Sequence, residues 1–407
     1  MKDQPKTLTP KLRFPKFIGQ PLRRLELKDV TAESTVRNAE TLPVASVMGV
    51  TKAEGIVPME ERLIAADIAR YKIVRKDWFA YNPMRLNIGS IARWKGDNDI
   101  LVSPDYVVFN CLEEADPALD PDYLDQFRQT GTWENFVTEG GDGSVRVRIY
   151  YKDIARIQLT LPSLAEQRKI AECLTSLDEL IATEGRKLEA LRAHKTGLMQ
   201  QIFPRDGETR PRLRFPEFRK APEWDRKALK DVCEVNPQNE RLPDSFVYID
   251  LESVEHGVLL SKKWVGREDA PSRAQRLLKN GDVVFQVVRP YQRNNLFVDF
   301  EDGESYVAST GYAHLRAYQS NSFLYQLVHT DPFVEKVIAK CTGSSYPAIN
   351  SNHLAEVPVF VPDPAEQQRL AAFLSPLDAL IASQSSKMDG MRSHKKGLMQ
   401  QLFPIPT

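Results

Sequence analysis

Arginines and amides stand beside aromatic residues in two short stretches, one in each half of the chain. The first combines Tyr81-Asn-Pro-Met-Arg85 with Arg93-Trp-Lys95, and the second is Arg289-Pro-Tyr-Gln-Arg293 followed by Asn294. Arginine and lysine suit contacts with phosphates, and arginine or asparagine can form two hydrogen bonds with one guanine or adenine edge. Both stretches are therefore candidate nucleic-acid contacts, although each residue taken singly is equally typical of a solvated basic loop.

Further basic or polar residues extend the candidate set. The secondary candidates are Arg146 and Arg148, Lys262 and Lys263, and Ser344 to Tyr346. The complete predicted set is Tyr81, Asn82, Arg85, Arg93, Lys95, Arg146, Arg148, Lys262, Lys263, Arg289, Tyr291, Arg293, Asn294, Ser344 and Tyr346.

Motifs for catalysis are missing from the sequence. An amino-methyltransferase needs an (N/D)PP(Y/F) tetrapeptide, but the nearest strings, Asn82-Pro-Met-Arg85 and Asp331-Pro-Phe333, lack the second proline. The phosphate loop of a motor contains a Gly-Lys pair, which occurs nowhere in the chain, and the histidines form no H-E-x-x-H pattern. We expect no catalytic residue, no metal site and no cofactor of the chain's own. A nuclease with dispersed catalytic carboxylates has no fixed motif, so this class of enzyme is harder to exclude.

Composition and charge are those of an ordinary globular protein with two or three domains. The chain has 407 residues, and 55 Lys and Arg balance 55 Asp and Glu, so any nucleic-acid site must be a local patch rather than a general cationic field. A start without an apolar core and the lack of any run of about 18 apolar residues argue against secretion and membrane insertion and predict a cytoplasmic protein. The four cysteines show no C-x-x-C spacing, which predicts small core residues rather than zinc ligands or disulfides.

The elements that must position these candidates are two copies of one long segment. Pro162–Pro204 returns as Pro362–Pro404 at a constant offset of 200 residues, and about half of the aligned positions are identical. Asp363, Pro364 and Glu366 predict a capped helix start in the second copy, and Ser163 with Glu166 predicts a capping box in the first. Each copy is expected to form one helix of about 36 residues, roughly 54 Å long.

Apolar residues recur in both helices at alternating steps of four and three, which is a heptad seam. The residues predicted to pair the helices are Ile170, Leu174, Leu177, Ile181, Leu188, Leu191, Leu370, Leu374, Leu377, Ile381, Met388 and Met391. Both seams are interrupted at the same places, by Glu184 or Gln384 and by Lys195 or Lys395. Matched interruptions favour an antiparallel coiled coil of the twin helices. The alternative is that each helix packs onto its own domain.

A second repeat completes the organisation of the chain into two half-units. Pro10–Phe17 (PKLRFPKF) matches Pro211–Phe218 (PRLRFPEF), and a Leu-Lys-Asp-Val string follows each copy. The bodies between these segments and the helices differ in sequence and mix β-rich runs with turn signals, which predicts an α/β or α+β fold. The expected domains are 1–161, with an opening segment at 10–30; helix 162–204; 205–361, with a linker at 205–211 and an opening segment at 211–232; and helix 362–407.

The repeated signature P-x-x-x-E-Q…L-x-x-L-D-x-L-I-A…K-x-G-L-M-Q-Q-x-F-P resembles the conserved regions of type I restriction-modification specificity subunits (HsdS) over the full length. The first body, with Tyr71–Gly89 and Ser103–Tyr106, is similar to one type of target recognition domain in that family. The second, with Pro271–Arg276, Gly281–Pro290 and Ala308–Gly311, is similar to another type.

The resemblance implies a non-catalytic subunit that reads double-stranded DNA. It also implies two HsdM methyltransferase subunits, which bind S-adenosylmethionine and modify adenine N6, and HsdR translocase-nuclease subunits in the full complex. The two bodies differ, which implies that the two half-sites differ as well.

Geometry supports the same mechanism without the family name. Twin helices paired antiparallel have a pseudo-two-fold axis, and two bodies so related could each meet a major groove about one turn, roughly 34 to 36 Å, apart. The target would be split and asymmetric, with a spacer set by the helices, and helix faces outside the seam would dock the methyltransferases. The rival is a coiled-coil scaffold without sequence-specific DNA binding. Neither the target sequence nor the spacer length follows from the sequence.

Overall fold

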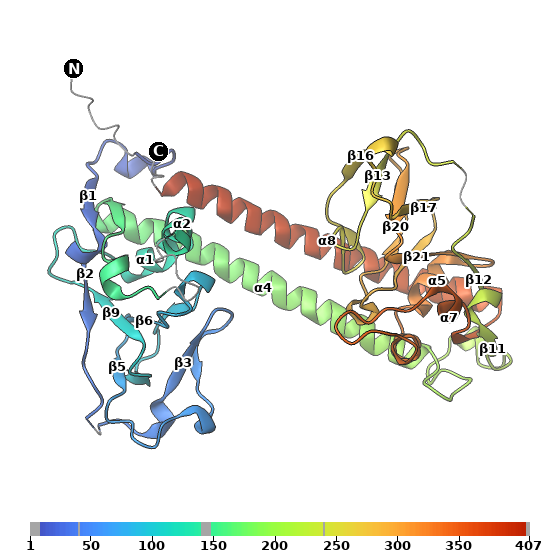
Figure 1. The fold of residues 1–407 in the computed structure, drawn as a ribbon, viewed down its shortest axis with the longest axis horizontal. Coiled ribbons are helices and arrows are strands. Elements are labelled where there is room, and N and C mark those ends of the chain that lie inside the picture. Colours follow the sequence, from blue (N-terminus) through green and yellow to red (C-terminus); the bar gives the residue numbers. More distant parts are fainter. Residues whose placement is uncertain (1–8, 40, 140–147, 239–240, 404–407) are drawn as a thin grey trace. The chain divides into compact units, whose positions relative to one another are not determined.

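The computed structural model describes residues 9–39, 41–139, 148–238 and 241–403, and its contacts group into two units (Figure 1). Unit 1 comprises Met1–Thr183 with Asp389–Thr407, and unit 2 comprises Glu184–Met388. Each unit contains one variable body and a part of each long helix. The division between the two units therefore falls inside the helices.

The body of unit 1 is a mixture of short strands and short helices, as predicted. Its elements are β1 (Arg23–Glu26), β2 (Thr31–Ser34), β3 (Met48–Thr51), β4 (Gly55–Pro58), β5 (Lys72–Val74), β6 (Phe79–Tyr81), β7 (Ile91–Arg93), β8 (Ile100–Val102), β9 (Val107–Cys111), α1 (Pro121–Phe127), α2 (Gly131–Glu139), α3 (Tyr151–Ile154) and β10 (Gln158–Leu161). The main sheet is antiparallel with the order β2-β9-β6-β7, and β1 pairs with β10.

The body of unit 2 follows the same plan and adds a second four-stranded sheet. Its elements are β11 (Asp225–Ala228), β12 (Cys233–Val235), β13 (Ser245–Ile249), β14 (Val254–Glu255), β15 (Val258–Leu259), β16 (Lys263–Gly266), β17 (Ala274–Leu278), β18 (Val283–Gln286), β19 (Leu296–Phe297), β20 (Tyr306–Ser309), β21 (Tyr312–Ala317), α5 (Asn321–Leu327), α6 (Asp331–Ala339), α7 (Ser351–Ala355) and β22 (Pro358–Val361). The order β12-β21-β18-β19 corresponds to the main sheet of unit 1, β11 pairs with β22, and the added sheet is β16-β13-β20-β17.

The frame shared by the two bodies lies next to the long helices, and the differences lie in the added strands. In both units a pair of short helices follows the last strand of the main sheet, α1 with α2 or α5 with α6. In unit 2 the two short helices are separated at Val328–Thr330, where Thr330 Oγ1 donates to the carbonyl oxygen of Leu327 at 2.8 Å.

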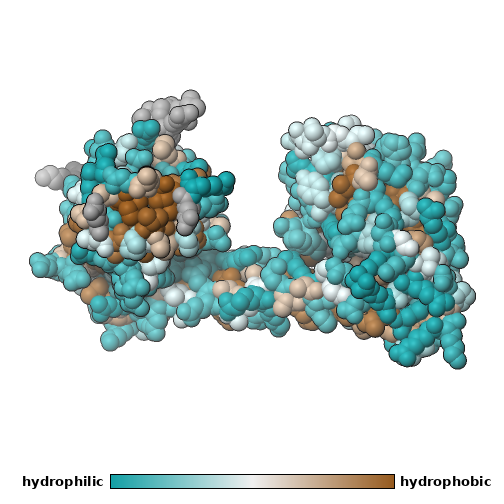
Figure 2. Space-filling view, turned by 90° about the horizontal axis from the view of Figure 1, so that it is seen from below, coloured by the Kyte–Doolittle hydropathy of each residue, from teal (hydrophilic) through white to brown (hydrophobic). Residues whose placement is uncertain are grey.

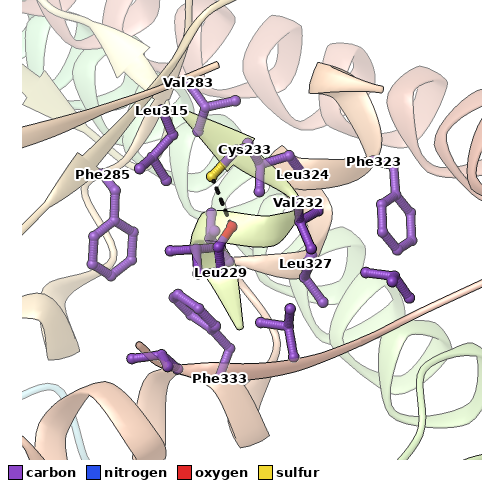
Figure 3. Close-up of a cluster of buried hydrophobic side chains, with 14 of the residues drawn as sticks. Leu229, Val232, Cys233, Val283, Phe285, Leu315, Phe323, Leu324, Leu327 and Phe333 are labelled. Carbon is purple, nitrogen blue, oxygen red and sulfur yellow. Dashed lines mark hydrogen bonds between the residues drawn. The ribbon is translucent and has the colours of Figure 1, made fainter. Parts of the chain in front are cut away.

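The core of unit 2 joins the main sheet to the short helices. Figure 3 shows Phe285 and Leu315 from the sheet near Leu324 and Leu327 of α5 and Phe333 of α6. All five side chains are buried, with exposed fractions of 0 to 4%, so the sheet and the helices form a single hydrophobic core.

Cysteine fits this core as a small apolar residue. Cys233 is fully buried, and its Sγ donates to the carbonyl oxygen of Leu229 at 3.5 Å (Figure 3). All four cysteines are free thiols, and Cys111, Cys173 and Cys341 are half-buried.

The two long helices are α4 (Leu164–Ile202) and α8 (Pro364–Leu402). The predicted cap of α8 is confirmed, because Asp363 Oδ1 accepts hydrogen bonds from the amides of Ala365 and Glu366 at 3.0 and 3.2 Å. The capping box predicted for α4 is wrong. The Glu166 carboxylate binds the Arg13 guanidinium, with Nε and Oε1 2.8 Å apart, and does not turn back to Ser163.

The contacts between α4 and α8 give the relative direction of the two helices. Within unit 1, Asp178 of α4 meets Lys395 of α8. Within unit 2, Glu184 meets Gln384, and Lys195 meets Asp378. As the α4 residue number rises, that of the α8 partner falls, so the helices pair antiparallel. The predicted fold class of two mixed bodies, each followed by a long helix that joins the antiparallel pair, is confirmed.

Individual seam positions divide between two roles. Ile170 and Leu174 are buried in the core of unit 1 together with Met399 and Leu402, so the first turns of α4 pack onto a body as well as onto α8. Leu370 and Leu374 do the same in unit 2. Both alternatives from the sequence therefore hold at these positions. Nearer the middle, Leu188 and Met388 are buried, and the half-buried positions are Leu177, Ile181, Leu191, Leu377, Ile381 and Met391.

Among the described residues, no helix is long and apolar enough to cross a bilayer. The face drawn in Figure 2 is mostly hydrophilic, with a hydrophobic area on unit 1.

Candidate nucleic-acid interface

The structure brings together two of the predicted polar segments in unit 2. We call them loop cluster 2, defined as Arg289–Asn294 with Ser344–Tyr346. The amide of Arg289 donates to the carbonyl oxygen of Pro347 at 2.7 Å, and the Arg289 guanidinium carbon lies 4.4 Å from the centre of the Tyr346 ring. Tyr346 is 65% exposed and Tyr291 is 51% exposed. A guanidinium held on an exposed aromatic face can still present its donor edge to a base or a phosphate.

The arginines of loop cluster 2 have strained backbone conformations that neighbouring contacts hold in place. Arg289 and Arg293 both adopt left-handed conformations, with φ of 55° and 54°, on either side of the short turn Pro290–Gln292. Such conformations are costly for residues other than glycine and cluster at functional sites. The buried Gln286 supports the turn, since its Nε2 donates to Gln292 Oε1 at 2.8 Å and its Oε1 accepts from the Asn294 amide at 3.1 Å.

Arg293 and Asn294 point into the body rather than outward. Arg293 Nη2 lies 2.6 Å from Asp331 Oδ1, and its Nη1 donates to the carbonyl oxygen of His329 at 3.1 Å. Burial would raise the pKa of Asp331, but hydrogen bonds from Arg293 and Gln200 hold it below its ordinary value. Asn294 Oδ1 accepts from the amide of His256 at 3.2 Å. These two half-buried residues hold the loop in position, and their role as direct contacts stays a prediction.

Loop cluster 1 is the equivalent surface of unit 1, defined as Asn82–Ile88 with Arg148–Tyr150. The amide of Ile149 donates to the carbonyl oxygen of Pro83 at 3.0 Å and ties the two segments together. Arg85 and Arg148 are exposed and make no ion pair within the described residues. Asn82 is half-buried and shapes its own loop, because its Oδ1 accepts from the Met84 amide at 3.0 Å.

Tyr81 is wrong as a nucleic-acid contact. Its side chain is fully buried in the core of unit 1, near Phe109, and its hydroxyl has no hydrogen-bond partner among the described residues. Burial raises the pKa of this hydroxyl. The aromatic residue that loop cluster 1 does expose is Tyr150, at 42%, next to Arg148. The sequence string Arg148-Ile-Tyr150 carries the same basic and aromatic signal, which the prediction did not extend to Tyr150.

Arg93 and Lys95 belong to an ion-pair network inside unit 1. The Arg93 side chain is only 4% exposed and contacts Asp122 and Asp77, the latter at 3.3 Å. Lys95 Nζ lies 3.6 Å from Asp125. The carboxylates of Asp122 and Asp125, both on α1, would compete with a DNA phosphate for Arg93 and Lys95. The prediction is therefore wrong for the buried Arg93, and Lys95 is exposed but paired.

The lysines of the added sheet in unit 2 are also paired. Lys263 Nζ lies 2.7 Å from Asp250 Oδ2, and Lys262 contacts Asp302. Hydrogen bonds from Lys262 and Tyr306 lower the pKa of Asp302 to about 2. Ser344 and Tyr346 are exposed in loop cluster 2, whereas Arg146 lies outside the described residues.

Two buried arginine–glutamate pairs were missed by the sequence analysis. Arg13 binds Glu166 in unit 1, and Arg214 binds Glu366 in unit 2 with Nε–Oε1 and Nη2–Oε2 distances of 2.7 and 2.6 Å. In each pair the side chains are 8% and 1% exposed. The signal was available, because both arginines stand in the repeated Leu-Arg-Phe-Pro string and both glutamates in the repeated Glu-Gln string.

The glutamines that follow these glutamates are buried as well. Gln167 Nε2 donates to the carbonyl oxygens of Pro162 and Ala118, and Gln367 Nε2 donates to that of Pro362, all at 3.0 Å. His194 and His394 are exposed, as are Gln200, Gln201 and Gln400.

The arrangement resembles that of proteins whose class is known. A model of the type I restriction modification DNA specificity domain matches residues 135–193 and 222–388, which is more than half of the chain. The chain belongs to this family of DNA specificity proteins. Its role is accordingly DNA sequence recognition in a restriction-modification system, and a scaffold without sequence-specific DNA binding is not favoured.

Relatives in this family are distant in sequence. The type I restriction enzyme MjaVIII specificity subunit of Methanocaldococcus jannaschii is 23% identical over 305 residues, which cover 72% of this chain and 71% of the relative. The EcoDI specificity subunit of Escherichia coli is 22% identical over 298 residues, covering 66% and 65%. The S subunit of a type I system from M. genitalium has the same fold, with a TM-score of 0.60, 13% identity, and coverage of 98% of this chain and 100% of that chain.

Proposed function

We propose that each body of this specificity subunit reads one half of a split, asymmetric DNA target through its loop cluster. The observation that carries the proposal is a duplicated frame with unlike loops. The Arg–Glu pairs and the Asp–Lys contacts recur at equivalent positions in both units, whereas loop clusters 1 and 2 differ in sequence and in the strands around them. Equivalent frames present the loops alike, and unlike loops select unlike sequences.

Direct readout falls to a few residues of the two loop clusters in this proposal. In unit 2 they are the half-buried Arg289 and the exposed Tyr291 and Tyr346, and in unit 1 they are the exposed Arg85, Arg148 and Tyr150. Arginine with two donors toward one guanine is the commonest specific contact in the major groove. Lysines already held by carboxylates would contribute to orientation on the phosphate backbone after exchange of partners.

The long helices set the spacer and dock two HsdM methyltransferase subunits. Support comes from exposed polar residues that recur outside the seam, among them His194 with His394 and Gln200 with Gln400, since helix pairing alone does not require this repetition. In the full complex HsdR subunits join, and S-adenosylmethionine is bound by HsdM. The chain itself binds no cofactor and carries no catalytic residue, and it works in the cytoplasm.

A gel shift with turnover assays separates this proposal from its rivals. The chain co-purified with its methyltransferase should retard a subset of genomic fragments in the presence of excess nonspecific DNA, and the purified chain alone should neither methylate nor cut DNA. Equal retardation of every fragment would favour the scaffold. Cleavage or methylation by the chain alone would favour the enzyme reading.

A further inference from the structure

A polar junction in unit 2 joins both long helices to the body. Lys195 of α4 contacts Asp378 of α8, and Gln326 of α5 donates through its Nε2 to the other oxygen of Asp378 at 2.6 Å. The Lys195 ammonium also lies 5.9 Å from the centre of the Tyr325 ring. Three separate elements thus meet at one carboxylate.

Unit 1 contains the same junction at positions 200 residues away. Lys395 of α8 holds both carboxylate oxygens of Asp178 of α4, at 2.6 and 2.8 Å, and Gln126 of α1 donates to Asp178 Oδ2 at 3.0 Å. Gln129 adds a contact, with its Oε1 3.0 Å from Lys395 Nζ. The Lys, Asp and Gln positions correspond one to one with Lys195, Asp378 and Gln326.

Helix pairing alone does not explain polar residues at these positions. Gln126 and Gln326 are 5% and 1% exposed, and Lys395 is 8% exposed. Replacing a buried polar group by a well-packed apolar one is often neutral or stabilising, whereas a buried polar group admits few alternative arrangements. A lysine in the seam therefore selects one geometry among those that leucine would tolerate.

The short helix of each body extends the junction further into the body, to loop cluster 2 in unit 2 and to the main sheet in unit 1. In unit 2, α5 carries Gln326, and the turn after it carries His329, whose carbonyl oxygen accepts from Arg293 of loop cluster 2 at 3.1 Å. In unit 1, α1 carries both Gln126 and Asp122, and Asp122 holds Arg93 at the end of β7. A tilt of the body on the helices would break hydrogen bonds at both ends of this connection.

We propose that the junctions Lys395–Asp178–Gln126 and Lys195–Asp378–Gln326 are positioning residues for DNA recognition, which fix each body on the helix pair and thereby restrict the target to one spacer length. The helices determine which spacer length is preferred, and the junctions determine how strongly other spacer lengths are rejected. This inference rests on the proposed reading of a split target.

Methylation of a spacer series by the intact complex with methyltransferase tests the proposal. The duplexes keep both half-sites and vary the spacer by one base pair in either direction. Lys195→Met and Lys395→Met remove the charge at similar side-chain length, and Lys187→Met changes an exposed lysine of α4 as a matched control. The variants should lose spacer preference by roughly 2- to 100-fold, the range of coupling between contacting residues, with both half-sites unchanged, and the control should match wild type.

The outcomes separate the two proposals. Unchanged spacer preference in variants that still methylate overturns the junction proposal, even if their thermal stability falls. If the Met variants fail to assemble, Asp178→Asn and Asp378→Asn, which keep side-chain shape, decide by the same readout: relaxed spacing supports the junctions and unchanged spacing overturns them. A wild-type complex without any spacer-defined target would instead refute the proposed function itself.

Discussion

Gln384 Nε2 donates to Glu184 Oε2 at 2.6 Å and to the carbonyl oxygen of Glu184 at 3.2 Å. These residues occupy the same position in the two repeats. In an antiparallel pair of like helices, equivalent positions meet at the midpoint of the pairing, so this hydrogen bond marks that midpoint. Hydrogen bonds from Lys387 and Gln384 lower the pKa of the Glu184 carboxyl, which keeps it charged.

Lengthening both helices at this midpoint should lengthen the spacer. Four residues inserted after Glu184, with a matching insertion after Gln384, add about 6 Å to the pair, or roughly two base pairs at 3.4 Å each. Both half-sites should persist while the recognised spacer grows, as read from the methylated motif. Insertions of the same residues in the polar linker after Gly207 serve as the control. If the variant still binds DNA and recognises the original spacer, the length of the helices does not set the spacer.

Breaking one buried Arg–Glu pair should destabilise the protein strongly. Arg13→Ala leaves the carboxylate of Glu166, 1% exposed, without its charged partner, and such a loss costs about 3–5 kcal/mol. Arg13→Met with Glu166→Leu should recover most of that cost, because no buried charge remains. The free energy of unfolding in urea measures both.

An exposed pair provides the control for that experiment. Arg23 lies 3.4 Å from Asp116, with side chains 61% and 86% exposed, so Arg23→Ala should change stability by less than about 1 kcal/mol. Equal effects of Arg13→Ala and Arg23→Ala would show that the repeated Arg–Glu pair does not anchor the opening segment to the helix.

Loop cluster 2 should determine the base preference at one half-site and have no effect on the other. Arg289→Ala removes the guanidinium that lies over Tyr346, and loss of an arginine base contact costs roughly 1–3 kcal/mol of binding. The discrimination should relax at one or two base pairs of a single half-site, measured by binding to singly substituted duplexes. Arg226→Ala, an exposed arginine of β11, is the matched control. An equal loss of affinity for all duplexes would show that Arg289 contacts a phosphate and not a base.

Acid should weaken unit 2 through His329. Burial and the nearby Lys195 lower the pKa of this imidazole to about 4, and its ordinary value is about 6.5. Nδ1 donates to the carbonyl oxygen of Tyr325 at 2.7 Å, and Nε2 faces the Asn295 amide at 3.3 Å, which suits the neutral ring. The unfolded chain therefore binds the extra proton between these two pKa values. This contribution is fully present above pH 6.5 and is lost progressively as pH falls from about 6.5 to about 4, by at most about 1.4 kcal/mol per pH unit.

His329→Gln tests this pH dependence with the residue that unit 1 has at the equivalent position, Gln129. Between pH 6.5 and 4.5 the variant should lose less free energy of unfolding than wild type. His353→Gln, at an exposed histidine of α7, should behave like wild type. Parallel pH profiles for wild type and His329→Gln would place the acid sensitivity elsewhere.

The sequence predicted the frame well because the frame is periodic and repeated. The helix bounds, the Asp363 cap and the antiparallel pairing follow from heptad spacing and from matched interruptions, which are local signals. The role of Glu166 did not follow. Its spacing from Ser163 fits a capping box, but its partner, Arg13, lies 153 residues away, and only tertiary packing brings the two together.

Contacts in the recognition bodies were predicted less well for a related reason. Composition marks Tyr81, Arg93 and Arg289 alike as basic or aromatic residues near turns. The fold then buries Tyr81 in the core, pairs Arg93 with carboxylates of α1, and leaves only Arg289 stacked on an exposed ring. Exposure and pairing depend on residues distant in the chain, and no local pattern encodes them.

Genome-wide adenine methylation tests the central claim most directly. The chain is co-expressed with its methyltransferase subunit in a host that lacks other adenine methylation, and the same host with the methyltransferase alone is the control. The account predicts one split, asymmetric motif with a fixed spacer, present only with the chain. A continuous or symmetric motif, or the same motif without the chain, would contradict it.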